Sequence, residues 1–199
     1  MPYPSAPHTL APLWRACLLS GLLVLLQTGG EAVEMALRLD AAALAQGQWW
    51  RLLSAHFVHL GWLHTLLNAL GVCLCWALAP QVFDRALPAR LAGLALGVSA
   101  CLWAFTPQVL PYVGLSGVLY GLFVLGLVPQ ARARDPLAVL ALLLIAGWLL
   151  WQGLGDSGAG EERLLGGRVV GQAHLFGIAL ALSWLAIGAT ARRLSRRAG

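Results

Sequence analysis

Six long apolar runs constrain the fold of this chain more than any other feature of its sequence. They cover about residues 13–28, 59–79, 89–105, 115–129, 136–152 and 169–191. A membrane-spanning helix needs about 20 mostly apolar residues, so six spans would use most of the 199 residues. Only 11% of the residues are charged, whereas a soluble domain carries about 25%. We therefore expect an all-α membrane protein in which residues 1–199 form a single six-span domain.

The arginines predict how these spans are oriented. All 13 basic residues are Arg. If both termini are cytoplasmic, nine of them fall on the cytoplasmic side and four on the other: Arg15, Arg85, Arg90, Arg132, Arg134, Arg192, Arg193, Arg196 and Arg197 against Arg38, Arg51, Arg163 and Arg168. The excess of positive charge in cytoplasmic loops favours this arrangement. No basic run is interleaved with aromatic residues, so we expect the lipid bilayer, and no nucleic acid, as a partner.

The fourth apolar run is too short to cross the bilayer. Its 15 residues, from Leu115 to Pro129, would give about 22 Å of helix, and the hydrocarbon core is about 30 Å thick. Residues 106–114 before it contain two Pro and a Gly, which extend a helix poorly. Irregular backbone at this depth requires protein or a water-filled cavity around it. We therefore expect a sunken helix start, with Ser116 at the mouth of a cavity that opens outward.

Ser116 and His174 form the first candidate pair for chemistry. Ser116 lies between Gly114 and Gly117, which permit a tight turn and a close approach of another backbone. His174 lies near the outer end of the sixth run and could remove the Ser116 proton as a general base. A helix N-cap for Ser116 and a hydrogen-bonded helix-end histidine are the simpler alternatives. No acidic residue lies within an apolar run, so the expected unit is a dyad.

His64 and Asn68 form a second candidate pair. They are four residues apart and therefore share one face of the second run. Together with the Ser116 backbone N–H, they could stabilise the oxyanion of a tetrahedral intermediate. A hydrogen-bonded pair between helices is the alternative. His56, His59 and His64 lack the His-Glu-x-x-His pattern, and no carboxylate lies in a run, so we expect no metal and no other cofactor.

The ordered set of these motifs resembles the rhomboid intramembrane serine proteases. The set comprises Trp50-Arg51, His56, His59, His64, Asn68, Gly114-Leu115-Ser116-Gly117, Tyr120, Ala173-His174 and Gly177. The resemblance implies a six-helix rhomboid-like bundle with Ser116 as the nucleophile and His174 as its base. It also implies that His64 and Asn68 line the oxyanion hole.

The same resemblance implies supporting roles for several other residues. Tyr120 would stack against His174, and Gly177 would let the sixth span approach the fourth closely. Trp50 and Arg51 would belong to an outer loop beside the bilayer. One turn after Gly177, where the family has a small Gly, this chain has Ala181.

Within the family, the chain looks most similar to the bacterial rhombosortase branch, on its size and on its runs at 51–57 and 114–121. That resemblance implies cleavage of exported, membrane-anchored proteins that carry a Gly-Gly motif and a C-terminal transmembrane tail. The protein would then lie in the bacterial inner membrane with its active site towards the periplasm. An ordinary rhomboid with other single-span substrates, a catalytically inactive relative that binds and escorts membrane proteins, and a small transporter are the alternatives.

Overall fold

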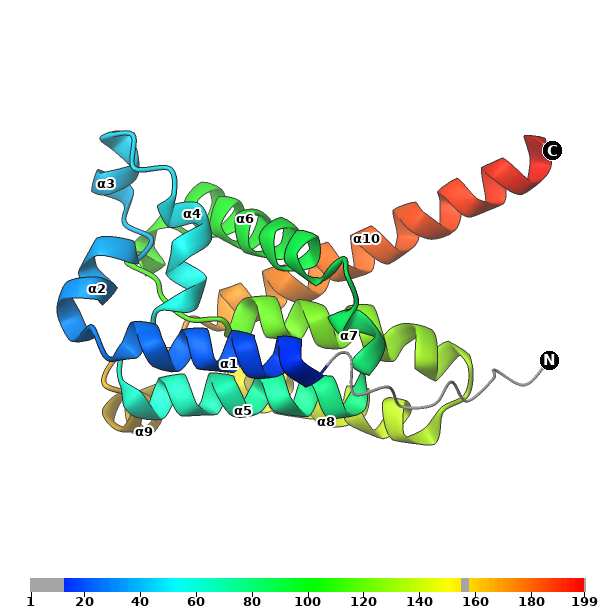
Figure 1. The fold of residues 1–199 in the computed structure, drawn as a ribbon, viewed down its shortest axis with the longest axis horizontal. Helices are drawn as coiled ribbons and strands as arrows, with labels where there is room; N and C mark the ends of the chain where they lie inside the picture. The colour runs from blue at the N-terminus through cyan, green and yellow to red at the C-terminus, as the bar shows by residue number, and fades with distance from the viewer. Residues whose placement is uncertain (1–12, 155–157, 199) are drawn as a thin grey trace.

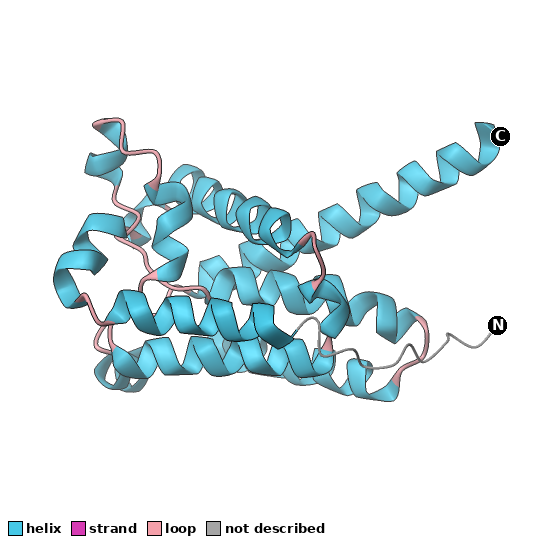
Figure 2. Ribbon diagram, viewed as in Figure 1, coloured by secondary structure: helices cyan, strands magenta, loops and turns pink. Residues whose placement is uncertain are grey.

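The computed structural model describes residues 13–154 and 158–198, and this part of the chain is built from helices and connecting loops (Figure 2). In chain order the elements are α1 (Leu13–Gln27), α2 (Gly30–Leu37), α3 (Ala41–Ala45), α4 (Arg51–Ser54), η1 (Ala55–Phe57), α5 (Trp62–Leu78), η2 (Pro80–Phe83), α6 (Leu87–Phe105), η3 (Pro107–Val109), α7 (Ser116–Arg132), α8 (Pro136–Leu154), α9 (Gly158–Leu165) and α10 (Gly171–Ala198). The all-helical expectation is therefore confirmed for the described residues.

The six apolar runs each overlap one of the long helices α1, α5, α6, α7, α8 and α10. Two bounds differ clearly: α5 begins at Trp62, after His59, and α10 continues beyond residue 191 to Ala198. By length and composition, two stretches of the described residues could each cross a membrane, Leu87–Phe105 and Gly171–Ser195. The number rises to four if each bent pair counts as one span: α1 with α2 at 110°, and Arg51–Phe57 with α5 at 92°. The chain is thus a membrane protein with several apolar helices, and the number of six spans stays a prediction.

Helix α7 occupies the middle of the bundle, in contact with α5, α6, α8 and α10. Its 17 residues correspond to about 26 Å, so it is shorter than the hydrocarbon core is thick. The helix continues through Pro129 to Arg132, three residues beyond the expected end. Proline has no backbone N–H, so the Leu125 carbonyl receives no hydrogen bond from residue 129, and only one helical bond is lost. The C-terminal half of α10 extends away from the bundle, beyond the ends of the other helices (Figure 1).

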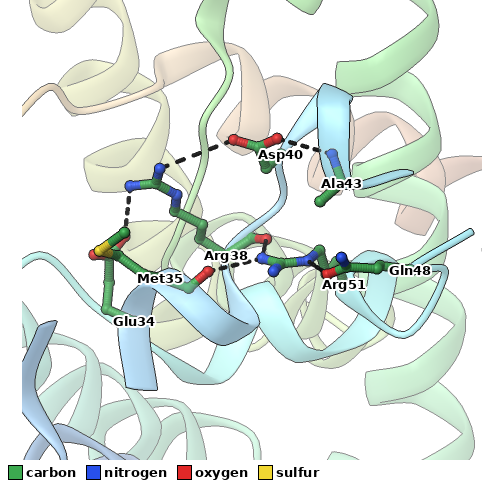
Figure 3. A network of polar contacts seen from close by, with 7 residues as sticks. All are labelled: Glu34, Met35, Arg38, Asp40, Ala43, Gln48 and Arg51. Carbon is green, nitrogen blue, oxygen red and sulfur yellow. Dashed lines mark hydrogen bonds and ion pairs between the residues drawn. The ribbon is translucent and has the colours of Figure 1, made fainter. Parts of the chain in front are cut away.

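The outer segment between α1 and α5 folds around the buried side chain of Arg51. Its Nε donates to the Gln48 side-chain oxygen at 2.7 Å. Its Nη1 donates to the carbonyl oxygens of Met35 at 2.9 Å and Arg38 at 2.8 Å, at the end of α2 (Figure 3). A planar guanidinium can satisfy several acceptors at once. Arg51 therefore closes this segment into a compact loop against α4.

The first part of the outer loop forms two short helices, α2 and α3, with a break between them at residues 38–40. The chain leaves helical geometry at Arg38, and Asp40 then starts α3 as its N-cap by accepting the Ala43 N–H at 3.0 Å. Between the two helices, Leu39 forms an isolated β-bridge with Tyr112. The outer loop is thereby tied to the segment that leads into α7.

Candidate active site

Ser116 is the first residue of α7, and the turn before it depends on Gly114. Gly114 has φ of +119°, a conformation that side chains disfavour. Its N–H donates to the Ala55 carbonyl at 3.0 Å, and a Cβ at this position would lie 2.9 Å from Cε1 of His64. The N-cap position belongs to Leu115 and has no side-chain hydrogen bond. The alternative in which Ser116 serves as the N-cap is therefore wrong.

His174 lies in the first turns of α10 and is buried, with 5% of its surface exposed. The Ser116 Oγ lies 2.9 Å from its Nε2, so the hydroxyl can donate to this nitrogen when the ring hydrogen is on Nδ1. Among the described residues, Nδ1 has no hydrogen-bond partner. The Tyr120 ring lies against the imidazole, with centroids 4.5 Å apart at 35°. Stacking therefore orients His174.

Glycines set the distance between α7 and α10. A Cβ on Gly117 would lie 2.8 Å from the Ala173 carbonyl oxygen, and a Cβ on Gly177 would collide with the Gly117 carbonyl oxygen. Farther along, Gly121 faces the Gly177 carbonyl oxygen, which would be 3.0 Å from an added Cβ, and Ala181 is fully buried. The two backbones thus approach closely, and this approach brings Ser116 to His174.

His64 and Asn68 lie on one face of α5 and line the same groove as Ser116 and His174. The Leu60 N–H donates to Nδ1 of His64 at 3.4 Å, which leaves the ring hydrogen on Nε2. Asn68 donates one amide hydrogen to the His64 carbonyl at 2.9 Å. This bond is within α5, so the alternative of an interhelical pair is not found. Each side chain retains a donor that a ligand could use.

The groove itself is long and apolar, with a volume of about 750 Å³. It runs from the first residues of α5 and α7 to Leu78 and Leu137 near the opposite end of the bundle. Its polar lining residues gather at one end. Most of the others are apolar side chains of α5, α7 and α8, and Leu164, Leu165 and Val169 complete the lining. The candidate site is therefore the polar end of an elongated apolar groove.

Comparison with known proteins gives this arrangement a family. Residues 46–190 match the Rhomboid domain, a stretch that contains every residue of the dyad and of the second pair. The chain belongs to the rhomboid family. It is also similar to rhomboid protease GluP of Bacillus subtilis (strain 168), with 31% identity over 84 residues. The match covers 41% of this chain and 16% of the length of GluP.

The sequence predicted roles for Ser116, His174, His64 and Asn68, and none for His56 and His59. The Nε2 of His56 lies 2.9 Å from both the Ala95 carbonyl oxygen and the Ser99 Oγ on α6. His59 is buried, and its Nε2 accepts the Leu115 N–H at 3.4 Å. Both histidines therefore connect the outer loop to other elements. The spacing of His56, His59 and His64 gave no sign of these partners.

Sequence reasoning also missed Tyr112. Its hydroxyl donates to the Gly114 carbonyl oxygen at 2.7 Å, and the side chain is almost fully buried. A single Tyr four residues before the serine, in an apolar stretch, is indistinguishable from an ordinary core residue in one sequence.

The resemblance to the rhomboid proteases assigned Trp50 and Arg51 to an outer loop. In the structure the Arg51 side chain is buried and the Trp50 side chain is exposed.

Proposed function

We propose that this rhomboid is an intramembrane serine endopeptidase that acts through Ser116 and His174. The observation that carries the proposal is the 2.9 Å contact between the Ser116 Oγ and the His174 Nε2 at the end of an apolar groove. A nucleophile within hydrogen-bond reach of a base is the signature of covalent catalysis. Membership of the rhomboid family supports the same chemistry.

In the proposed reaction, the Ser116 Oγ attacks the scissile carbonyl carbon while His174 Nε2 takes the hydroxyl proton. The carbonyl oxygen becomes an oxyanion, which the Nε2–H of His64, the remaining amide hydrogen of Asn68 and the Ser116 N–H would stabilise. The C–N bond then breaks, and His174 returns the proton to the leaving amine. Water, deprotonated by His174, hydrolyses the acyl-enzyme and restores Ser116.

The shape of the groove supports a membrane protein substrate. A groove that runs along α5, α7 and α8 fits an elongated apolar segment. Its walls are about as apolar as lipid tails, so a transmembrane segment could move from the bilayer into the groove without exposing its side chains to a more polar surrounding. We propose a membrane-anchored substrate with a C-terminal transmembrane tail. The runs at 51–57 and 114–121 support the finer assignment to rhombosortase-type processing of Gly-Gly-containing tails.

The distribution of arginines supports a six-span topology with both termini cytoplasmic, because nine of 13 then lie on the cytoplasmic side. In this orientation the outer loop around Arg51 and the polar end of the groove face the periplasm of a bacterial inner membrane. Ser116, at the start of the short helix α7, then lies below that surface. Peptide cleavage would take place near the periplasmic face.

The alternative is an inactive rhomboid-like protein that binds and escorts membrane proteins. It has no need of a serine hydroxyl directed at a buried histidine, so the Ser116–His174 contact favours the enzyme. A transporter would need a continuous polar pathway, whereas the polar lining of the groove is confined to one end.

The test is labelling of the detergent-solubilised protein by a fluorescent fluorophosphonate, together with cleavage of a single-span fluorescent reporter protein. The parent and the control Ser195→Ala, which removes an exposed hydroxyl at the far end of α10, should both be labelled and should both cleave the reporter. Ser116→Ala and His174→Ala should show neither labelling nor cleavage and should remain monodisperse. Reporter cleavage by Ser116→Ala at the parental rate would overturn the mechanism. A folded parent that neither labels nor cleaves would favour the escort function.

A further inference from the structure

The segment from Tyr112 to Leu115 is held in place on several sides before it enters α7. The backbones of Tyr112 and Leu39 exchange two hydrogen bonds. The Leu39 N–H donates to the Tyr112 carbonyl oxygen at 2.9 Å, and the Tyr112 N–H donates to the Leu39 carbonyl oxygen at 3.0 Å. The Tyr112 ring meets His56 edge-on at 5.5 Å. These contacts fix the position of the tyrosine itself, independently of its hydroxyl group.

The hydroxyl group of Tyr112 acts on the next turn of the chain. It donates to the Gly114 carbonyl oxygen at 2.7 Å, and both residues are buried. On the other side of the same peptide, the Leu115 N–H is directed at Nε2 of His59 at 3.4 Å. The Gly114–Leu115 peptide is therefore held at its oxygen and at its nitrogen, by side chains from two different segments.

This peptide needs such a restraint because it follows a glycine. Gly114 has φ of +119° and no Cβ, so rotation of the adjacent peptide meets little steric resistance from the residue itself. The next residue along the chain from this peptide is Ser116, whose N–H and Oγ both enter the proposed reaction. A rotation at Gly114–Leu115 would therefore move the nucleophile and one oxyanion donor together.

Burial also keeps the Tyr112 hydroxyl in the form that can donate. It raises the pKa of Tyr112, so the phenol retains its proton. The hydroxyl therefore remains a donor to the Gly114 carbonyl oxygen.

We propose that Tyr112 is a positioning residue for the proposed reaction: its hydroxyl holds the Gly114–Leu115 peptide so that Ser116 presents its Oγ and its N–H in the reactive geometry. This inference rests on the proposed function. The proposal gives the two parts of Tyr112 different roles: the ring packs the loop, and the hydroxyl contributes to the rate of the chemical step. Loss of the hydroxyl alone should therefore slow the chemical step and leave substrate binding in the groove unchanged.

The test is Tyr112→Phe, which removes only the oxygen, measured on the single-span reporter with kcat and KM determined separately. We expect kcat to fall about 10- to 100-fold, since small misplacements of reacting groups cost rates of this size. KM should stay within about twofold of the parent, and fluorophosphonate labelling should slow in parallel with kcat. The control is Ser54→Ala, which removes a 2.8 Å hydrogen bond to the Leu37 carbonyl in the outer loop and should keep the parental kcat.

Three outcomes would overturn the inference: a parental kcat in folded Tyr112→Phe, a change in KM alone, or a variant that cannot be recovered folded, which would make the role structural. Ser116→Ala in the same series separates this inference from the proposed function. If Ser116→Ala is inactive and Tyr112→Phe is parental, only the positioning role fails. If Ser116→Ala cleaves the reporter normally, the proposed function fails and the positioning role fails with it.

Discussion

Replacing Gly117 by Ala tests whether the spacing of α7 and α10 sets the catalytic distance. The new methyl carbon would lie 2.8 Å from the carbonyl oxygen of Ala173, and ordinary contact begins at 3.4 Å, so the two backbones must separate by about 0.6 Å. Gly117 is adjacent to Ser116 and Ala173 is adjacent to His174. The separation is therefore transmitted directly to the dyad.

The size of the effect follows from this geometry. If the whole shift reaches the side chains, the distance from Ser116 Oγ to His174 Nε2 rises from 2.9 Å to about 3.5 Å, the outer limit of a hydrogen bond. A misplacement of 1 Å can cost about 10²-fold in rate, so we expect Gly117→Ala to lower kcat/KM about tenfold. The fluorophosphonate labelling rate should fall by a similar factor.

The matched control is Gly21→Ala in α1, because a Cβ at Gly21 would have nothing within 4 Å. It should keep the parental rate, and Ala in place of an exposed helical Gly should slightly stabilise the fold. A second variant sharpens the test: adding Ala173→Gly to Gly117→Ala should not restore activity, since the closest obstacle is the backbone oxygen of residue 173. Parental cleavage by Gly117→Ala, or full rescue by Ala173→Gly, would refute the reasoning.

Two further variants examine the oxyanion donors and the outer loop. Asn68→Ala should lower kcat about 10²–10³-fold with little change in KM, and a parental kcat in the reporter assay would make Asn68 structural. Arg51→Lys should lower the free energy of unfolding by about 1–3 kcal/mol, because one ammonium group cannot satisfy the Gln48 side chain and two carbonyls in the geometry of the guanidinium. Thermal unfolding in detergent measures this change, and an unchanged midpoint would contradict it.

The long helices were predictable from the sequence because their composition alone determines them. In a bilayer every backbone polar group must be satisfied within the structure, so an apolar run of this length has almost no alternative to a helix. The ends were less predictable: α7 passes through Pro129 and continues to Arg132. The division of residues 32–44 into α2 and α3 was not predictable either, because it depends on Arg51, a residue outside that stretch that binds the carbonyl oxygens at the end of α2.

The resemblance predicted the candidate dyad, the contact of Tyr120 with His174 and the close approach at Gly177. The contacts that hold the turn before Ser116 could not be predicted from the sequence. Periodicity identifies the face of a helix on which His174 lies, and it carries no information about how closely α10 approaches α7. The contact between the Leu115 N–H and His59 joins residues 56 positions apart, and the hydroxyl of Tyr112 acts on a carbonyl group that every residue possesses. Backbone partners of this kind leave no pattern in a single sequence.

The way in which His174 is oriented explains why these supports matter. No described residue accepts a hydrogen bond from its Nδ1, so no carboxylate fixes the rotation of the ring within its plane. Stacking with Tyr120 restrains the tilt of that plane, and a stacked ring can still slide. The remaining restraint must come from where α10 lies relative to α7 and from where α7 begins. Gly117 and Gly177 determine the first, and Gly114 with the hydroxyl of Tyr112 determines the second. The accuracy of such a dyad therefore depends on backbone positions, and substitutions that shift the backbone by a fraction of an ångström should lower the rate about tenfold although they remove no group that touches the substrate.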